Sequence, residues 1–127
     1  LQEKVNEVRA AGAQVVILLS HNGADTDIKL ASRVSGLDAI LGGHTHDAIP
    51  RALEMKNPGG MTLVTNAGSN GKFVGVLDFD VRDGRVRDWS YQLLPVFAEL
   101  PSLPAFDMPN FAEAIPEAAS AVAASSV

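Results

Sequence analysis

Two short apolar runs, each followed at once by a loop that carries histidine, constrain the fold of this chain most strongly. The first run covers residues 14–19 and leads to His21, and the second covers residues 37–41 and leads to His44 and His46. Both runs consist mainly of β-branched and aliphatic residues, which is typical of strands buried on both faces. All three histidines of the chain are therefore expected at strand ends.

Helices are expected next to these strands. Residues 1–12 carry apolar side chains on one helical face, and Gly12 would stop that helix. A second helix is predicted at about residues 27–34, with Thr26 or Asp25 as its N-terminal cap. Because helices alternate with short buried strands, the first part of the chain has the pattern of an α/β fold.

The pattern changes after residue 49 and predicts antiparallel β structure. The expected strands cover residues 51–55, 62–65, 73–81 and 85–94. Turn-forming residues 57–60 separate the first two strands, and Asp83 and Gly84 separate the last two, which is a strong hairpin signal. Two hairpins are therefore predicted in the second part of the domain, in contrast to the first part.

The overall composition suits one modest domain. The chain has 127 residues, of which 46% are hydrophobic, and a formal net charge of −5 with a pI near 5.0. Scattered basic residues and a negative charge argue against a nucleic-acid surface, and no apolar run is long enough for a membrane helix. The absence of cysteine excludes disulfides and thiolate sites but leaves the compartment open.

We predict that the domain covers residues 1–97 and that residues 98–127 form a linker or disordered tail. This last segment contains no Lys or Arg and is rich in Pro and Ala. A short helix starting near Pro116 is the alternative for part of it. Since Leu1 already lies within a helical pattern, we expect the chain to be a fragment of a longer protein.

A metal site is the chemistry that the histidines indicate. His44 and His46 follow two glycines, so their loop can turn tightly and present both imidazoles, which are common ligands of Zn, Mn and Fe ions. A bare pair of this kind is more often two surface residues. His21 shifts the balance towards metal ligation, because ligand sites in open α/β sheets form beyond the carboxyl ends of strands. Three imidazoles without carboxylates remain an incomplete set for two metals.

Several polar residues lie near the predicted ligands. Asp47 could orient an imidazole through its second nitrogen, as could Asn22, although Asp47 could equally be an ordinary turn residue. Asp25 and Asp27 could be acidic ligands, but helix capping is the simpler explanation and the one we favour.

Residues 66–72 form a glycine-containing loop. They fail the Walker phosphate-loop pattern, because Asn66 stands where glycine is required and Phe73 where serine or threonine is required. The glycines instead suggest a tight strand connection that brings Asn66, Gly68 and Asn70 near the site.

Together these segments resemble the calcineurin-like metallophosphoesterases. Residues 16–23 and 40–46 look like the last two metal-binding motifs of the 5′-nucleotidase branch, and residues 66–75 look like the loop and strand that follow. Within that branch, residues 20–23, 31–36 and 65–73 are most similar to the SoxB family of thiosulfohydrolases.

The resemblance implies an α/β fold, the C-terminal half of a four-layer α/β/β/α domain. It implies two divalent metal ions, manganese in this family, with His21 and His44 on one ion and His46 on the other. It also implies a periplasmic enzyme that hydrolyses a cysteine S-thiosulfonate on the SoxYZ carrier protein and releases sulfate.

The chain lacks several motifs of the family pattern. The Asp-x-His, Gly-Asp-x-x-Asp and Gly-Asn-His motifs that complete the family's metal site do not occur in it and are expected upstream. The chain alone is therefore expected to bind metal poorly, and it offers no catalytic residue beyond metal ligands. A 5′-nucleotidase or related phosphoesterase is the first alternative, and a non-catalytic α/β module with incidental histidines is the second.

Overall fold

The computed structural model describes residues 1–97, so the predicted tail lies outside the described residues. The helices and strands are α1 (Gln2–Ala10), β1 (Ile17–Leu19), α2 (Ala24–Ala31), β2 (Ala39–Gly42), β3 (Leu53–Asn57), β4 (Gly60–Asn66), β5 (Phe73–Arg82) and β6 (Arg85–Pro95). Helices and the first strands alternate as predicted. Neither of the two helices within residues 1–97 is long and apolar enough to cross a membrane.

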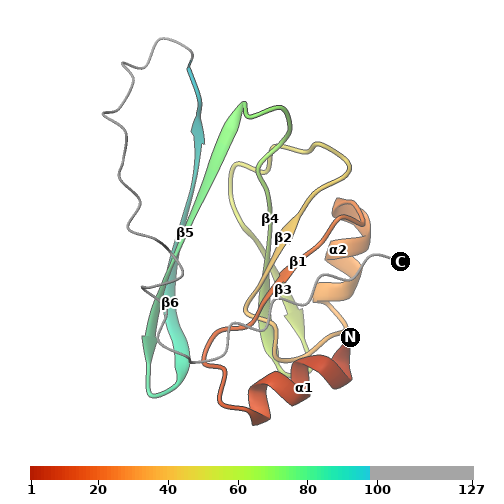
Figure 1. Cartoon of the computed structure of the whole chain (residues 1–127), viewed down its shortest axis with the longest axis vertical. Helices are drawn as coiled ribbons and strands as arrows, with labels where there is room; N and C mark the ends of the chain where they lie inside the picture. The colour runs from red at the N-terminus through yellow and green to blue at the C-terminus, as the bar shows by residue number, and fades with distance from the viewer. Residues whose placement is uncertain (98–127) are drawn as a thin grey trace.

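The strands form a four-stranded mixed sheet and a separate two-stranded ribbon. The order in the sheet is β1-β2-β4-β3, with β1, β2 and β4 parallel and β3 antiparallel to β4. The ribbon of β5 and β6 lies on one side of the sheet and α2 lies on the other (Figure 1). The α/β fold class is confirmed, with three layers in the order α/β/β.

Both hairpins are confirmed, but the separation into a parallel and an antiparallel half is wrong. Asp83 and Gly84 both have positive φ, 52° and 71°, which matches the tight turn expected between β5 and β6. The strand β4, however, pairs with β3 on one edge and with β2 in parallel on the other. The second half of the sequence therefore supplies part of the same sheet as the first half.

The core lies between the sheet and the helices. Its buried residues come from one face of the parallel strands and from the helices and loops that cover them: Val5, Leu18, Ala31, Val34, Leu37, Ile40 and Val64. Burying the Val, Leu and Ile side chains of this set contributes about 1.5–3 kcal/mol each, so this layer carries much of the stability.

The expectation that the first strand is buried on both faces is wrong. Leu18 is 4% exposed, but Ile17 and Leu19 on the opposite face are 42% and 49% exposed. That face borders a cleft of about 300 Å³ between the sheet and the ribbon, lined by Ile17, Leu41, Leu77 and Tyr91 among others. The helices thus cover one face of β1, while the ribbon leaves the other partly open.

An ion pair fixes α1 against the sheet. Arg9, near the end of α1, pairs with the carboxylate of Asp38, which also accepts a hydrogen bond from the Val16 N–H at 2.6 Å. Arg9 donates as well to the carbonyl of Gly36 at 2.9–3.0 Å. These bonds align the start of β1 with the start of β2, so that both strands end at the same edge of the sheet.

The predicted start of the second helix is wrong by one turn. The helix α2 begins at Ala24 with Gly23 as its N-cap, and neither Asp25 nor Thr26 caps it. The cap comes from another loop, since the Ala24 N–H donates to the hydroxyl of Thr45 at 3.2 Å. Only glycine fits at position 23, because a Cβ there would lie 2.9 Å from the Thr45 methyl group and φ is 88°.

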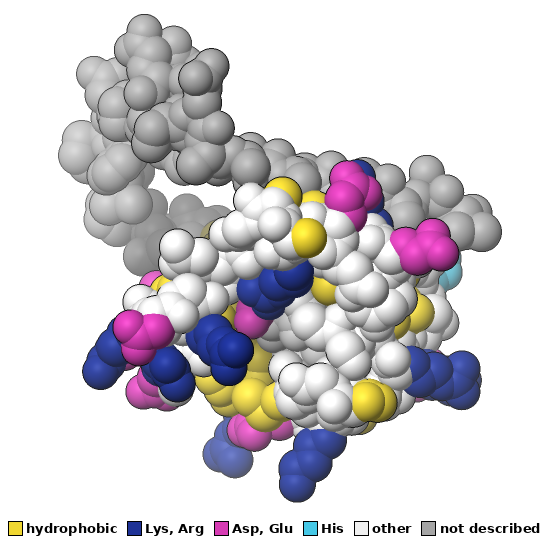
Figure 2. Space-filling view, turned by 90° about the horizontal axis from the view of Figure 1, so that it is seen from below, with side chains coloured by type: hydrophobic (Ala, Val, Ile, Leu, Met, Phe, Trp, Pro, Cys, Tyr) yellow, Lys and Arg dark blue, Asp and Glu magenta, His cyan; other side chains and the backbone are white. Residues whose placement is uncertain are grey.

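The surface carries both signs of charge. On the face drawn in Figure 2, basic side chains are spread over the molecule and interspersed with acidic ones. Nonspecific binding to a polyanion depends on clustered basic side chains, and this face does not concentrate them in one patch.

Candidate metal centre

Two of the three predicted ligands meet at the carboxyl ends of β1 and β2. The Ser20 N–H donates to the Leu41 carbonyl at 2.9 Å, which continues the strand pairing up to the residue before His21. The imidazole rings of His21 and His44 lie 5.2 Å apart between centroids, at an interplanar angle of 71°. Both side chains are at least partly exposed, so a ligand can reach them.

Glycine at position 43 makes room for the imidazole of His21. A Cβ at Gly43 would lie 3.3 Å from Nδ1 of His21, which is tighter than an ordinary contact. The two imidazoles supply neutral nitrogen donors of the kind that bind divalent transition metals. The residues therefore fit part of a metal's coordination sphere.

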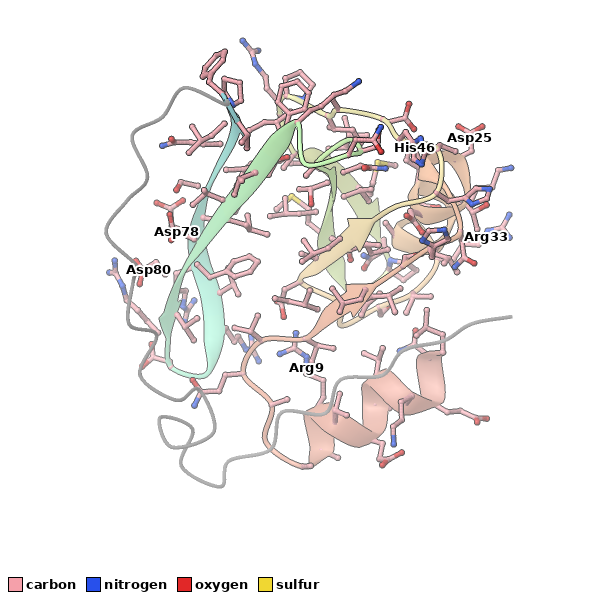
Figure 3. The ribbon with its side chains drawn as sticks, turned by 45° about the horizontal axis from the view of Figure 1, so that its top comes forward. Arg9, Asp25, Arg33, His46, Asp78 and Asp80 are labelled. Carbon is pink, nitrogen blue, oxygen red and sulfur yellow. The ribbon has the colours of Figure 1, made fainter. Side chains whose placement is uncertain are left out.

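His46 does not join this pair in the structure. Within residues 1–97, no group of three or more His, Asp or Glu side chains is arranged to hold a metal ion. Figure 3 shows His46 at the same corner of the molecule as Asp25, above α2. The roles of His21, His44 and His46 as ligands therefore stay predictions, and the structure supports the proximity of the first two.

The histidine loop has an unusual backbone. His44 and His46 have φ values of 74° and 58°, in the left-handed region that non-glycine residues seldom adopt. Hydrogen bonds within the loop hold this conformation: the Thr45 N–H donates to the Gly43 carbonyl at 3.0 Å, and the Thr45 hydroxyl donates to the Asp47 carboxylate at 2.5 Å. Such conformations cluster at functional sites, where surrounding contacts maintain them.

The positive φ of His44 can be tested with a pair of variants. We expect His44→Gly to be more stable than His44→Ala by about 1 kcal/mol, because only glycine adopts this region without steric cost. Urea unfolding measures the difference. In the exposed part of α2 the order must reverse, with Thr26→Gly less stable than Thr26→Ala by about 1 kcal/mol. Equal stability of the two His44 variants would contradict the backbone conformation described.

Asp47 and Asn22 form hydrogen bonds within the two histidine loops. Asp47 accepts from Thr45, and the Asn22 amide donates to the Ser20 hydroxyl oxygen at 3.1 Å. In the part of the chain that the structure describes, neither residue is hydrogen-bonded to a histidine. Their prediction as partners of the imidazoles thus stays a prediction.

The loop at residues 66–72 lies beside the segment that follows His46. The Gly68 N–H donates to the Asp47 carbonyl at 2.8 Å, and the Ile49 N–H donates to the Asn66 carbonyl at 2.9 Å. Asn66 is buried, whereas Asn70 is exposed. The loop leads into the strand β5 rather than a helix, in agreement with its failure to match the Walker pattern.

Tyr91 has a role that the sequence did not reveal. It lies on β6, and its hydroxyl donates to the Ile49 carbonyl at 3.1 Å, so it ties the ribbon to the segment after His46. Partial burial raises the pKa of the Tyr91 hydroxyl. A tyrosine in a strand gives no sequence signal for such a contact, because the partner lies far away in the chain.

Asp27 is buried, and its interpretation as a helix cap is wrong. Its side chain is 0% exposed, and its Oδ1 accepts a hydrogen bond from the Ser20 hydroxyl at 2.5 Å. Its Oδ2 would lie 2.6 Å from a Cβ at Gly42. Among the described residues, this Oδ2 and Nδ2 of Asn66 are the buried side-chain atoms without a hydrogen-bond partner. No sequence pattern pointed to this burial, since an acidic residue in the first turn of a helix is ordinary.

The burial of Asp27 predicts a dependence of stability on pH. Desolvation raises the pKa of the Asp27 carboxyl above its ordinary value of 3.8, and the bond from Ser20 partly opposes this rise. The folded state then holds the proton more tightly than the unfolded chain does. The stability that Asp27 contributes is fully present below pH 3.8 and is lost as the pH rises through the raised pKa.

We therefore expect Asp27→Asn, which cannot titrate, to gain stability relative to the wild type as the pH rises from below 3.8. The gain in the free energy of unfolding is about 1.4 kcal/mol for each unit by which folding raises the pKa of the Asp27 carboxyl. Urea unfolding of both proteins across a pH series measures it. A difference that stays constant with pH would contradict the prediction.

Comparison with known proteins identifies relatives of this chain. No family model matches it. It is 38% identical over 77 residues to the trifunctional nucleotide phosphoesterase YfkN of Bacillus subtilis, a match that covers 61% of this chain and 5% of that protein. It is 26% identical over 110 residues to the 5′-nucleotidase of Rattus norvegicus, covering 74% of this chain and 19% of that protein.

Solved structures agree with the sequence matches. The sulfate thiohydrolase SoxB of Thermus thermophilus aligns with a TM-score of 0.71 and 40% identity, over 79% of this chain and 18% of that one. The chain is a SoxB-like relative of the 5′-nucleotidases. A 5′-nucleotidase precursor from Thermus thermophilus aligns with a TM-score of 0.64 and 34% identity, over 74% of this chain and 21% of that one.

The similarity to these relatives extends to the fold, but it covers only a small part of each relative. The α/β arrangement matches the C-terminal part of the metallophosphoesterase fold in SoxB and the 5′-nucleotidases. These relatives are named as a sulfate thiohydrolase, a 5′-nucleotidase and a nucleotide phosphoesterase. The chain spans about a fifth or less of the length of SoxB, the rat 5′-nucleotidase and YfkN.

Proposed function

We propose that this SoxB-like chain supplies one part of the metal site of a dinuclear-metal hydrolase. The observation that carries the proposal is the pair of accessible imidazoles, His21 and His44, 5.2 Å apart at the carboxyl ends of parallel strands. Ligand sites form at this edge of α/β sheets. The similarity to hydrolases over about three quarters of the chain supports the same conclusion.

In this proposal His21 and His44 hold one ion and His46 the other, and further ligands come from outside the chain. Two divalent ions, proposed to be manganese, would activate a water molecule and neutralise charge on the oxygens of the departing group. The residues of this chain do the positioning. The backbone of residues 43–47, held by its own hydrogen bonds, presents His44 and His46 to solvent, and Gly43 leaves space for the ring of His21.

The substrate class that we favour is a cysteine S-thiosulfonate on a SoxYZ carrier protein, with sulfate as the released product. SoxB supports this choice, because its identity and TM-score, 40% and 0.71, exceed those of the 5′-nucleotidase precursor, 34% and 0.64. A periplasmic location follows from the same proposal. Nucleotide phosphoester hydrolysis is the second candidate, since the curated relatives are named as nucleotidases and a nucleotide phosphoesterase.

The test is an assay of the complete gene product that contains this chain, loaded with Mn²⁺. We expect sulfate release from carrier-bound thiosulfonate, and a loss of at least about a hundredfold in His44→Ala, because a lost ligand removes several kcal/mol of stabilisation. The control is Asp78→Ala, an exposed side chain on β5 away from His46 (Figure 3).

Each outcome selects one function. Phosphate release from AMP without sulfate release would establish the nucleotidase alternative. Neither activity, together with no effect of His44→Ala on bound metal, would leave a non-catalytic α/β module whose histidines are incidental.

A further inference from the structure

Asp27 is the buried ionisable group that the proposed metal site does not use. It projects from the first turn of α2 into the space beneath the ends of the parallel strands, where it is 0% exposed. Burying a carboxyl group without full hydrogen bonding costs stability, and an apolar side chain in the same place would avoid that cost. The contacts that Asp27 makes therefore need an explanation beyond packing.

The first contact leads to the loop of His21. The hydroxyl of Ser20, a residue only 8% exposed, donates to Oδ1 of Asp27 at 2.5 Å. The oxygen of that hydroxyl accepts in turn from the side chain of Asn22 at 3.1 Å. His21 lies between Ser20 and Asn22, so both residues that flank the imidazole are bonded into a chain that ends on Asp27.

The second contact leads to the loop of His44. The Oδ2 atom of Asp27 lies over Gly42, 2.6 Å from the place that a Cβ would occupy. Gly42 is the last residue of β2, two residues before His44. The carboxyl group is thus seated against the point at which the backbone leaves the sheet and enters the histidine loop.

A third strand end pairs with the end of β2. Asn66, 3% exposed, is the register partner of Gly42 in the parallel pair of β2 and β4, so both positions face the same side of the sheet. Its Nδ2 is a buried donor, and Oδ2 of Asp27 is a buried oxygen, and neither has a partner among the described residues. The end of β4 thus also carries a buried polar side chain, on the side of the sheet that Gly42 faces.

We propose that Asp27 is a positioning residue whose buried carboxyl joins α2 to the ends of β1 and β2 and thereby sets the spacing between the imidazoles of His21 and His44. The consequence for metal binding rests on the proposed function, whereas the consequence for spacing does not. Groups that orient metal ligands without touching the metal typically change metal affinity by about 10–100-fold when removed.

The test uses the complete gene product that contains this chain, with Zn²⁺ alone as a diamagnetic metal probe. The spacing is read from the nuclear Overhauser effect between the ring protons of His21 and His44, and Zn²⁺ affinity is read from a titration. We expect Asp27→Ala to lose the ring contact and to bind Zn²⁺ at least about tenfold more weakly. Asp27→Asn keeps an oxygen that accepts from Ser20, so it should retain both properties.

The control and a second variant keep the proposal falsifiable. Asp78→Ala, which truncates an exposed aspartate of the ribbon, should leave both measurements unchanged. A folded Asp27→Ala protein with wild-type ring contact and wild-type Zn²⁺ affinity would overturn the proposal. If Asp27→Ala does not fold, Ser20→Ala is tested instead. This variant removes the hydroxyl that donates to Asp27 and should weaken the contact between the imidazole rings. An unchanged ring contact in Ser20→Ala overturns the proposal.

The two measurements separate this inference from the proposed function. A wild-type gene product that shows the ring contact but binds no Zn²⁺ contradicts the metal site, while the variants still test the spacing. Zn²⁺ binding that is lost in His44→Ala but unaffected in folded Asp27→Ala supports the metal site and rejects the role of Asp27.

Discussion

Replacing Gly42 with alanine is expected to lower the free energy of unfolding by about 2–3 kcal/mol. A Cβ at this position would lie 2.6 Å from Oδ2 of Asp27 and 3.2 Å from the Thr65 carbonyl, and both distances are shorter than normal contacts. The loss comes from crowding rather than from the backbone, because Gly42 does not have the positive φ that would require glycine. Urea unfolding of the two proteins measures it.

A double-mutant cycle identifies the atom responsible. In an Asp27→Ala background the closest contact disappears, and we expect Gly42→Ala to cost only about 1 kcal/mol, so that the two changes are not additive. Gly75, a strand glycine whose added Cβ would meet nothing closer than 3.4 Å, supplies the control. Gly75→Ala should change stability by no more than about 0.5 kcal/mol. Additive effects at positions 27 and 42 would show that the carboxyl does not sit over Gly42.

Two isoleucines on neighbouring strands should differ greatly in their contribution to stability. We expect Ile40→Ala to cost about 2–5 kcal/mol, because Ile40 is 0% exposed within the core between the sheet and the helices. Ile17 is 42% exposed on the opposite face, beside the cleft. We expect Ile17→Ala to cost less, about 1 kcal/mol, because less apolar surface is buried there.

The same unfolding experiment checks both isoleucine variants, and each serves as the control for the other. Similar losses in the two would mean that both faces of the sheet are equally covered in solution. That result would contradict the open cleft between the sheet and the ribbon and would restore the sequence-based expectation of a strand buried on both sides.

The contrast between Ile17 and Ile40 also shows why sequence patterns predicted this fold only in part. Both residues lie in short apolar runs, and such a run reports a hydrophobic strand without reporting what covers each face. The hairpin at Asp83 and Gly84 was predictable because turn chemistry is local. The parallel pairing of β4 with β2 was not, because it depends on which strands become neighbours in space.

The candidate site, too, was predictable from the sequence only in part. His21 and His44 could be placed together because both follow strand-like runs and parallel strands end at the same edge of a sheet. The cap of α2 was missed because it is the Thr45 hydroxyl, from a loop distant in sequence. The burial of Asp27 was missed because the residue over which it lies, Gly42, belongs to another strand.

The order of strands has a consequence for how the chain folds. The ribbon joins β5 to β6 through a two-residue turn, and hairpins of this kind form in about 1–10 μs. The imidazole pair depends instead on β1, β2 and β4, whose pairing must close longer loops before any contact forms. We therefore expect the ribbon to appear early in refolding and the approach of His21 to His44 to be among the last events.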